Sequence, residues 1–222
     1  MTLLQARTTK VALCVVVFFV ASGFAGVITV TNPSFETLPT GGLPDGGCGT
    51  GCSFSTGVAI PGWTNVEFFS GQLQPGTQLG NHTMFDSLPD GITTAYANSG
   101  TIEQTVGAKV VDGATYTLTV DLGQRHDTAF TASADLLVGS TMFAATGSTP
   151  SPGGWSTYTA TFTGTAANAG ETITIQLNSS GLQANFDNVR LTASSTVPEP
   201  SSMLLLGSGV LVLVQGLRRK LL

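Results

Sequence analysis

Strict alternation between apolar and polar residues marks several segments in the middle of the chain. A period of two, with threonine at most of the polar positions, is typical of β-strands that bury one face. The pattern is strongest at residues 115–120, 157–162 and 172–177. It is weaker at residues 27–31, 102–106 and 136–138. The chain is therefore expected to contain many short strands.

Glycine and proline separate these segments in turn pairs such as Pro61-Gly62, and no helical period lies between them. Many short strands joined by turns predict an all-β domain, either a sandwich or a jelly roll. Two longer segments, 38–60 and 70–88, are irregular and contain no clear alternation. They are expected to cover one edge or face of the domain.

The N-terminus has the three parts of a secretory signal peptide. Arg7 and Lys10 give a positively charged start, residues 11–21 are apolar, and a small-x-small triplet follows at 23–25. The apolar part is shorter than the roughly 20 residues that cross a bilayer, which favours cleavage over an N-terminal membrane anchor. Residues 1–25 are therefore predicted to be a removable signal helix.

A second apolar segment lies at residues 203–217, and Arg218, Arg219 and Lys220 follow it. This order is typical of a stop-transfer sequence, whose basic residues stay in the cytoplasm and leave the preceding domain outside. The alternative is a hydrophobic helix packed on the domain, but the segment has no polar face. We expect a transmembrane helix at 203–217 and one globular domain at 27–193.

The low charge of the chain restricts its partners. Asp, Glu, Lys and Arg make up 9% of the residues, against about 25% in ordinary soluble proteins, and the net charge is -5. The predicted domain has no basic run, whereas phosphate binding needs clustered lysine and arginine. The composition therefore argues against nucleic acid as a partner and suits an exported β protein.

Cys48 and Cys52 are the two cysteines outside the predicted signal peptide, and they lie in a loop of small residues. A close pair in an oxidising compartment is expected to form a disulfide. The alternatives are a metal site or a redox pair. No further ligands lie nearby at metal spacing, and three residues separate the cysteines where the redox motif has two. The disulfide would act as a local structural staple.

The most polar stretch of the domain follows a strong strand and contains Arg125, His126 and Asp127. Such side chains could transfer protons in a cleft, or they could form a solvated strand end or the rim of a ligand site. We favour the second interpretation. Trp155 is a further candidate for ligand contact, because aromatic platforms next to polar groups bind sugars, although the start of a buried strand after Gly153-Gly154 explains it more simply.

Other residues carry weaker signals. Trp63 and Tyr96 could also be aromatic platforms, but packed structural positions explain them more simply. His82 lies in an irregular stretch where a surface loop is expected. No nucleophile-elbow phrase accompanies the serines, and nothing fixes the separation of two acids. The sequence therefore predicts no catalytic residue.

The C-terminal tail joins the triplet Pro198-Glu199-Pro200, the apolar segment and the basic end, in that order. This arrangement resembles the PEP-CTERM sorting tail of exported bacterial proteins. The resemblance implies that a membrane-embedded exosortase recognises the triplet and cuts a tail spanning residues 197–220. It also implies the secretion machinery as a partner, transient membrane anchoring, and release or attachment to the cell surface or to extracellular polysaccharide.

A second set of short phrases runs through the domain in a fixed order: NPSFE at 32–36, IPGW at 60–63 and ANFDNVRL at 184–191. The set resembles the galactose-binding-like β-sandwich of several carbohydrate-binding modules, which implies a jelly-roll fold. The same pattern also resembles the Stig cyclases, exported calcium-dependent proteins that rearrange and cyclise indole isonitrile terpenoids.

The resembled fold brings its first and last strands together, which implies that Glu36 and Asp187 approach each other. Two close carboxylates repel, and a hard divalent cation with oxygen ligands would offset that cost. In related modules acids at these positions hold a structural Ca²⁺, and we expect the same here. Phe186 and Val189 are three apart, so both face the core only if the strand bulges at Asp187-Asn188. The alternative is a simple turn with Glu36 solvated.

These observations favour a non-catalytic, glycan-binding domain of an exported cell-surface or matrix protein. One alternative is a small calcium-dependent cyclase or lyase that uses acids in the 121–127 region or on the terminal strands. The cyclase resemblance suggests an acid near the last strand as proton donor, but Asn185 precedes Phe186-Asp187 at that point. Another alternative is a structural surface protein without a small ligand.

Overall fold

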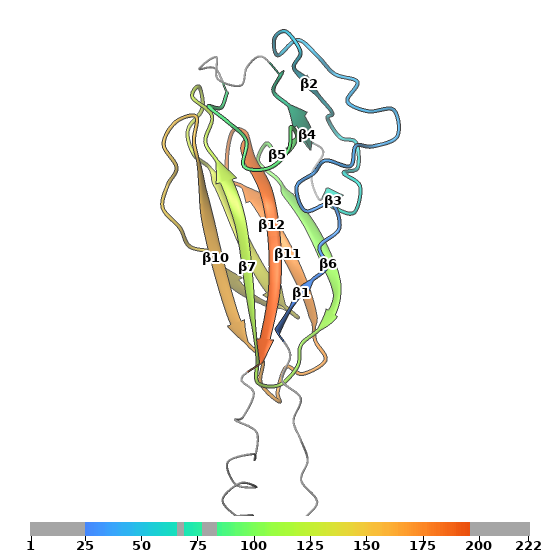
Figure 1. The fold of residues 1–222 in the computed structure, drawn as a ribbon, viewed down its shortest axis with the longest axis vertical. Coiled ribbons are helices and arrows are strands. Elements are labelled where there is room, and N and C mark those ends of the chain that lie inside the picture. Colours follow the sequence, from blue (N-terminus) through green and yellow to red (C-terminus); the bar gives the residue numbers. More distant parts are fainter. Residues whose placement is uncertain (1–24, 66–68, 77–83, 196–222) are drawn as a thin grey trace, which may run out of the picture. The chain divides into compact units, whose positions relative to one another are not determined.

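The computed structural model describes residues 25–65, 69–76 and 84–195. In these ranges two antiparallel sheets form an all-β sandwich, as predicted (Figure 1). The predicted signal helix, His82, the sorting triplet and the predicted transmembrane helix lie outside the described residues. Among the residues that are described, no helix is long and apolar enough to cross a membrane.

The larger sheet has the strand order β10-β7-β12-β5-β4-β2, and β1 also pairs with β12. Its strands are β1 (Ala25–Ile28), β2 (Ser53–Phe54), β4 (Ser70–Gln74), β5 (Thr94–Ala97), β7 (Ala114–Gly123), β10 (Trp155–Thr163) and β12 (Ala184–Ser195). The smaller sheet has the order β3-β6-β11-β8-β9. Its strands are β3 (Thr64–Asn65), β6 (Thr101–Lys109), β8 (Ala132–Val138), β9 (Thr141–Ala144) and β11 (Thr172–Ser179).

The alternating segments form the strands that their pattern predicts. Residues 115–120 lie in β7, 157–162 in β10 and 172–177 in β11. Their apolar side chains are buried in the main core, and the threonines between them are at least partly exposed. Burial of these apolar faces is the main stabilising contribution to the sandwich.

Strand β12 connects the two ends of the fold within one sheet. Its first residues pair with β5, most of its length pairs with β7, and its last residues pair with β1 (Figure 1). The register with β7 shifts between Asp187 and Arg190, and Asn188 there has a φ of 53°. The predicted bulge is confirmed, because it allows both Phe186 and Val189 to be fully buried.

Strands β4 and β5 depart from the alternation rule. The sequence predicts an irregular segment at 70–88, but residues 70–74 of it form β4, and all four residues of β5 are buried. The 38–60 segment covers these strands, with the Ser55 N–H donating to the Gln72 carbonyl at 2.9 Å. A strand buried on both faces shows no polar–apolar alternation, which explains the wrong prediction.

A second, smaller hydrophobic cluster lies beside the main core. It is formed by Cys52, Leu73, Met84, Phe85 and Tyr96. The long segment before β4 gathers at this end of the sandwich (Figure 1). The cluster therefore joins the 38–60 segment to the larger sheet and provides the floor of the candidate site.

Candidate functional site

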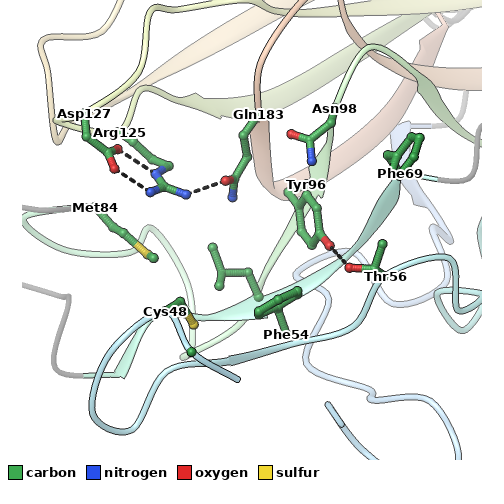
Figure 2. Close-up of a pocket in the computed structure, with 12 residues that line it drawn as sticks. Cys48, Phe54, Thr56, Phe69, Met84, Tyr96, Asn98, Arg125, Asp127 and Gln183 are labelled. Atoms are coloured by element: carbon green, nitrogen blue, oxygen red, sulfur yellow. Dashed lines mark hydrogen bonds and ion pairs between the residues drawn. The ribbon is translucent and has the colours of Figure 1, made fainter. Parts of the chain in front are cut away.

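A pocket of about 550 Å³ lies where the 38–60 segment meets β4 and β5 (Figure 2). Small-molecule sites in proteins have volumes of roughly 300–1,000 Å³. The described residues that line the pocket are Gly47, Cys48, Phe54, Thr56, Phe69, Leu73, Met84, Tyr96, Asn98, Arg125, Asp127 and Gln183. We refer to it as the Arg125 pocket.

Apolar side chains form most of its wall. Leu73 and Tyr96 come from the buried strands β4 and β5, and Phe54 comes from β2. The Phe54 and Tyr96 rings meet edge to face, with centroids 6.5 Å apart and planes at 75°. Phe69 is 59% exposed and adds an aromatic ring that solvent can reach. Such a surface favours a ligand with an apolar or aromatic body.

The hydroxyl group of Tyr96 is held by two partners on the 38–60 segment. It donates to the carbonyl oxygen of Ser55 at 2.8 Å and lies 2.9 Å from Thr56 Oγ1. Because its one hydrogen is used by Ser55, Thr56 is the donor in the second bond. Burial raises the pKa of Tyr96 above its ordinary value. The hydroxyl therefore stays neutral and fixes the ring instead of exchanging protons.

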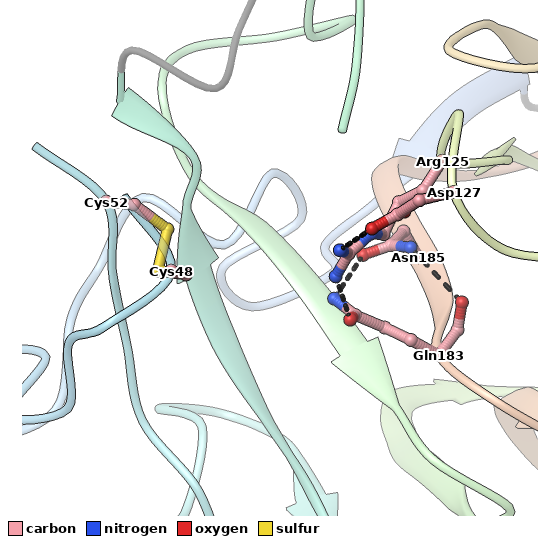
Figure 3. A network of polar contacts seen from close by, with 6 residues as sticks. All are labelled: Cys48, Cys52, Arg125, Asp127, Gln183 and Asn185. Carbon is pink, nitrogen blue, oxygen red and sulfur yellow. Dashed lines mark hydrogen bonds and ion pairs between the residues drawn. A yellow bond between two sulfur atoms is a disulfide. The ribbon is translucent and has the colours of Figure 1, made fainter. Parts of the chain in front are cut away.

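An ion pair and an amide form the polar side of the pocket. Arg125 donates from Nε to Asp127 Oδ1 at 2.8 Å and from Nη2 to Asp127 Oδ2 at 2.6 Å. Its Nη1 donates to Gln183 Oε1, and Gln183 Nε2 donates to Asn185 Oδ1 at 3.2 Å (Figure 3). Figure 2 shows Arg125, Asp127 and Gln183 facing Cys48 and Phe54 across the pocket. The bidentate geometry fixes the guanidinium plane.

The ion pair leaves this side of the pocket without net charge. The hydrogen bonds from Arg125 hold the pKa of Asp127 below its ordinary value, so the carboxylate is ionised at neutral pH. Among the described residues that line the pocket, Asp127 is the one carboxyl group. The described wall thus offers hydrogen bonds to a ligand but no protonated carboxylic acid.

The sequence offers four candidate ligand contacts, Arg125, His126, Asp127 and Trp155, and the structure places them in two different parts of the surface. Arg125 and Asp127 line the pocket together. His126 Nε2 instead lies 3.0 Å from Asp86 Oδ1. Trp155 lines a separate cavity of about 400 Å³, which Asp86 also lines. Arg125 and Asp127 therefore belong to the Arg125 pocket, whereas His126 and Trp155 lie near Asp86 at the second cavity.

Most of the pocket lining carries no signal in the sequence. Tyr96 is buried, as a structural position requires, but its ring also lines the pocket. Leu73 and Met84 lie in the 70–88 segment, which has no alternation, and Gln183 lies just before β12. The one available signal is the group of apolar residues within two glycine-rich irregular segments. Apolar residues in irregular segments are too common to identify a pocket without coordinates.

Cys48 and Cys52 form a disulfide with their Cα atoms 5.6 Å apart, which confirms the prediction. Cys52 is buried in the second hydrophobic cluster, whereas Cys48 lines the pocket. The staple is therefore part of the candidate site (Figure 3).

The acids predicted to bind calcium both accept hydrogen bonds from one short loop. Glu36 Oε1 accepts from the backbone N–H groups of Ile92 at 2.9 Å and Thr93 at 2.7 Å. Asp187 Oδ2 accepts from the backbone N–H of Asp90 at 3.1 Å. The first and last parts of the domain thus contact the same loop.

Asp187 is fully buried, and burial raises the pKa of its carboxyl group to about 8. The nearby Asp90 and Asp121 carboxylates contribute to this rise, whereas backbone N–H bonds from Asp90 and Asn188 oppose it. A divalent cation would offset the cost of ionising this group. Among the described residues, no three His, Cys, Asp or Glu side chains are grouped to hold a metal. Ca²⁺ at Glu36 and Asp187 would need backbone carbonyl oxygens as well, and it stays a prediction.

Comparison with known proteins gives matches to two families. Residues 26–192 match the family of HpiC1 cyclases, and residues 196–220 match the PEP-CTERM protein-sorting motif. No curated protein matches the chain.

Solved structures from Fischerella share the fold. The apo form of a cyclase from Fischerella sp. is 24% identical and has a TM-score of 0.61, with 76% of this chain and 96% of that chain covered. A cyclase from Fischerella sp. TAU is 25% identical and has a TM-score of 0.58, with 77% and 98% covered. A Stig cyclase from Fischerella sp. TAU, in complex with (3Z)-3-(1-methyl-2-pyrrolidinylidene)-3H-indole, is 24% identical, with 77% and 98% covered and a TM-score of 0.59.

Proposed function

The chain belongs to the HpiC1 cyclase family, and from this premise we propose that its domain binds a small, neutral, largely apolar molecule in the Arg125 pocket without transforming it. The pocket lining carries the proposal. Apolar side chains face an Arg125–Asp127 pair that carries no net charge. A neutral ligand leaves water at lower cost than an ion, and its polar end can bind the fixed guanidinium and amide groups.

The PEP-CTERM motif implies that the protein is exported and sorted to the cell surface by an exosortase. We propose the finer organisation that the sequence predicts: a signal peptide at 1–25, a domain at 27–193 and a sorting signal at 197–220. Membrane anchoring through residues 203–217 before processing, and later attachment to extracellular polysaccharide, belong to the same proposal. The pocket would then work outside the cytoplasm.

A cyclase-like reaction is the second candidate, and the family match is the observation that favours it. Two features of the site argue against it. The carboxyl group of Asp127 is held ionised by Arg125, so it is a poor proton donor at neutral pH. Asn185, just before the Phe186-Asp187 phrase, is a fully buried amide and not an acid.

A glycan is the alternative ligand class, and it is the one that the sequence predicts. The amides of Asn98 and Gln183 lie in the same pocket lining as the Phe54 and Tyr96 rings, a combination that suits sugar binding. The galactose-binding-like jelly-roll assignment and the structural Ca²⁺ at Glu36 and Asp187 are part of this proposal.

Fluorescence titration with a neutral apolar probe, N-phenyl-1-naphthylamine, tests the function. We expect saturable binding to the purified protein. Phe69→Ala should weaken it roughly fivefold, because it removes half-exposed apolar contact area. The matched control is Met142→Ala, which truncates a side chain that is 61% exposed and outside the pocket lining. It should leave binding unchanged.

Two parallel assays separate the alternatives. Binding on a glycan array that Phe69→Ala reduces, without binding of the probe, would replace the apolar ligand with a sugar. Conversion of an indole isonitrile terpenoid, detected as new isomers by chromatography with mass spectrometry, would establish the cyclase alternative. Absence of saturable probe binding would contradict the proposed function.

A further inference from the structure

The hairpin that carries the disulfide has a glycine-rich tip at residues 46–51, whose backbone can adopt many conformations. Residues 45–54 form the hairpin, and the N–H groups of Asp45 and Phe54 each donate to the other residue's carbonyl, at 2.9 and 3.0 Å. Of the six residues 46–51, four are glycine, and three of these have positive φ. Glycine loses more conformational entropy than any other residue when it is ordered. The tip therefore needs a constraint beyond its own backbone.

This hairpin forms one wall of the Arg125 pocket. Gly47 and Cys48 contribute from the tip and Phe54 from the base. The disulfide links Cys48 to Cys52, and Cys52 is buried in the cluster that also contains Leu73. One covalent bond thus ties the wall of the pocket to its floor.

A close backbone approach holds the other side of the tip. A Cβ atom added at Gly76, just after β4, would collide with the carbonyl group of Gly51. The N–H of Cys52 donates to the Gly49 carbonyl at 3.1 Å, which closes the turn between the two cysteines. The tip can approach β4 this closely only while the turn keeps its folded conformation, which the disulfide stabilises.

We propose that the Cys48–Cys52 disulfide is a redox-dependent latch, and that the Arg125 pocket is complete only in the oxidised protein. The inference rests on the proposed function, since it concerns the same pocket. The reduced chain keeps its sandwich, because the main hydrophobic core contains neither cysteine. Its tip then samples many conformations, and binding must supply the free energy of ordering the wall.

The redox step is a thiol–disulfide exchange. The two thiols lose two protons and two electrons and form the S–S bond, while the disulfide of an envelope thiol oxidant is reduced to two thiols. Dithiothreitol reverses the step in vitro: it transfers two hydrogen atoms to the cysteines and becomes a cyclic disulfide. Export therefore couples the arrival of the protein outside the cytoplasm to the completion of its pocket.

Titration of the full chain with N-phenyl-1-naphthylamine, with and without dithiothreitol, tests the proposal. We expect reduction to weaken binding about tenfold or more, the size expected for releasing a short closed loop. The double variant C48S/C52S should bind as weakly without reductant and should not respond to it. Hydrogen exchange at the amides of residues 46–54 should accelerate on reduction, while far-ultraviolet circular dichroism stays that of a β-sheet protein.

The outcomes distinguish this inference from the function on which it rests. Equal binding by oxidised and reduced protein overturns the latch and leaves the pocket function intact. If neither form binds the probe, the proposed function fails, and hydrogen exchange alone decides: faster exchange supports the latch, unchanged exchange overturns it. Loss of the β-sheet spectrum on reduction also overturns it, because the disulfide would then support the whole domain.

Discussion

Asn185 and Asp187 stand two positions apart on β12, both fully buried, yet their surroundings suit different groups. Asp187 accepts from backbone N–H groups of Asp90 and Asn188, at 3.1 and 2.7 Å, which favour its carboxylate form against the burial that raises its pKa. Asn185 accepts from Gln183 Nε2 and donates from Nδ2 to the Gln183 carbonyl at 3.4 Å. Only a group with both a donor and an acceptor satisfies Gln183.

Asn185→Asp tests this difference. The new oxygen would face the Gln183 carbonyl, so the buried carboxyl group should stay protonated at neutral pH. We expect the free energy of unfolding to fall by about 4 kcal/mol at pH 7, because the folded carboxyl group stays protonated about three pH units above its unfolded pKa. An acid whose pKa is raised in the folded state loses stability as pH rises above the unfolded pKa of about 3.9, so the deficit should vanish below that pH. Urea unfolding at pH 3.5 and pH 7 measures it, and a deficit that does not change with pH would contradict the argument.

The Arg125–Asp127 pair predicts the pH dependence of the pocket. The hydrogen bonds from Arg125 lower the pKa of Asp127 in the folded state. The pair is therefore fully formed above the unfolded pKa and is lost only as pH falls through the lower folded pKa. Probe binding should stay constant from about pH 7 to pH 5. Arg125→Gln should return the Asp127 pKa to its ordinary range in a carboxyl NMR titration, and an unchanged pKa would refute the assigned cause.

At the scale of elements, alternation predicts only strands with one buried face. Strands β7, β10 and β11 bury one face each and follow the predicted pattern. Strands β4 and β5 are buried on both faces, so their sequences resemble irregular segments. The floor of the pocket is built from these two strands, and for that reason sequence analysis identified its charged side but not its apolar side. The disulfide was predictable because close cysteines in an exported chain have few other uses.

A glycine pair tests how the 38–60 segment packs on β4. A Cβ atom at Gly71 would collide with the Ser55 carbonyl, whereas one at Gly107 on β6 would meet nothing within 4 Å. Gly71→Ala should lower the free energy of unfolding by about 3 kcal/mol, because two backbones must separate. Gly107→Ala should change it little, because the new Cβ atom has open space. Neither glycine has a positive φ, so backbone strain does not separate the two variants. Urea denaturation compares them, and equal effects would show that the segment does not pack closely there.

At the scale of the whole molecule, the chain combines a sorting tail with a β-sandwich domain. The sorting tail was predictable from sequence because its three parts lie next to one another, and the family match confirms it. The resemblance to the cyclase family was also visible, because its phrases keep their order along the chain. The pocket could not be read in this way, since its lining comes from seven separate stretches between Gly47 and Gln183 that only the fold brings together.

Calcium provides a test of how the ends of the domain are joined. If Glu36 and Asp187 hold Ca²⁺, excess calcium should raise the melting temperature by roughly 5 °C relative to a chelator. Asp187→Asn should abolish that shift. The matched control is Asp135→Asn, which changes another buried acid, hydrogen-bonded to Asn178 at 2.7 Å on the smaller sheet. A shift that survives Asp187→Asn, or the absence of any shift, would reject calcium at these residues.

Binding at the Arg125 pocket is tested most directly by mapping the binding of N-phenyl-1-naphthylamine by NMR on the isotopically labelled protein. We expect saturable shifts of the signals of Phe54, Tyr96 and Gln183, around one pocket. Shifts confined to the cavity beside Trp155, or no saturable shifts at all, would contradict it.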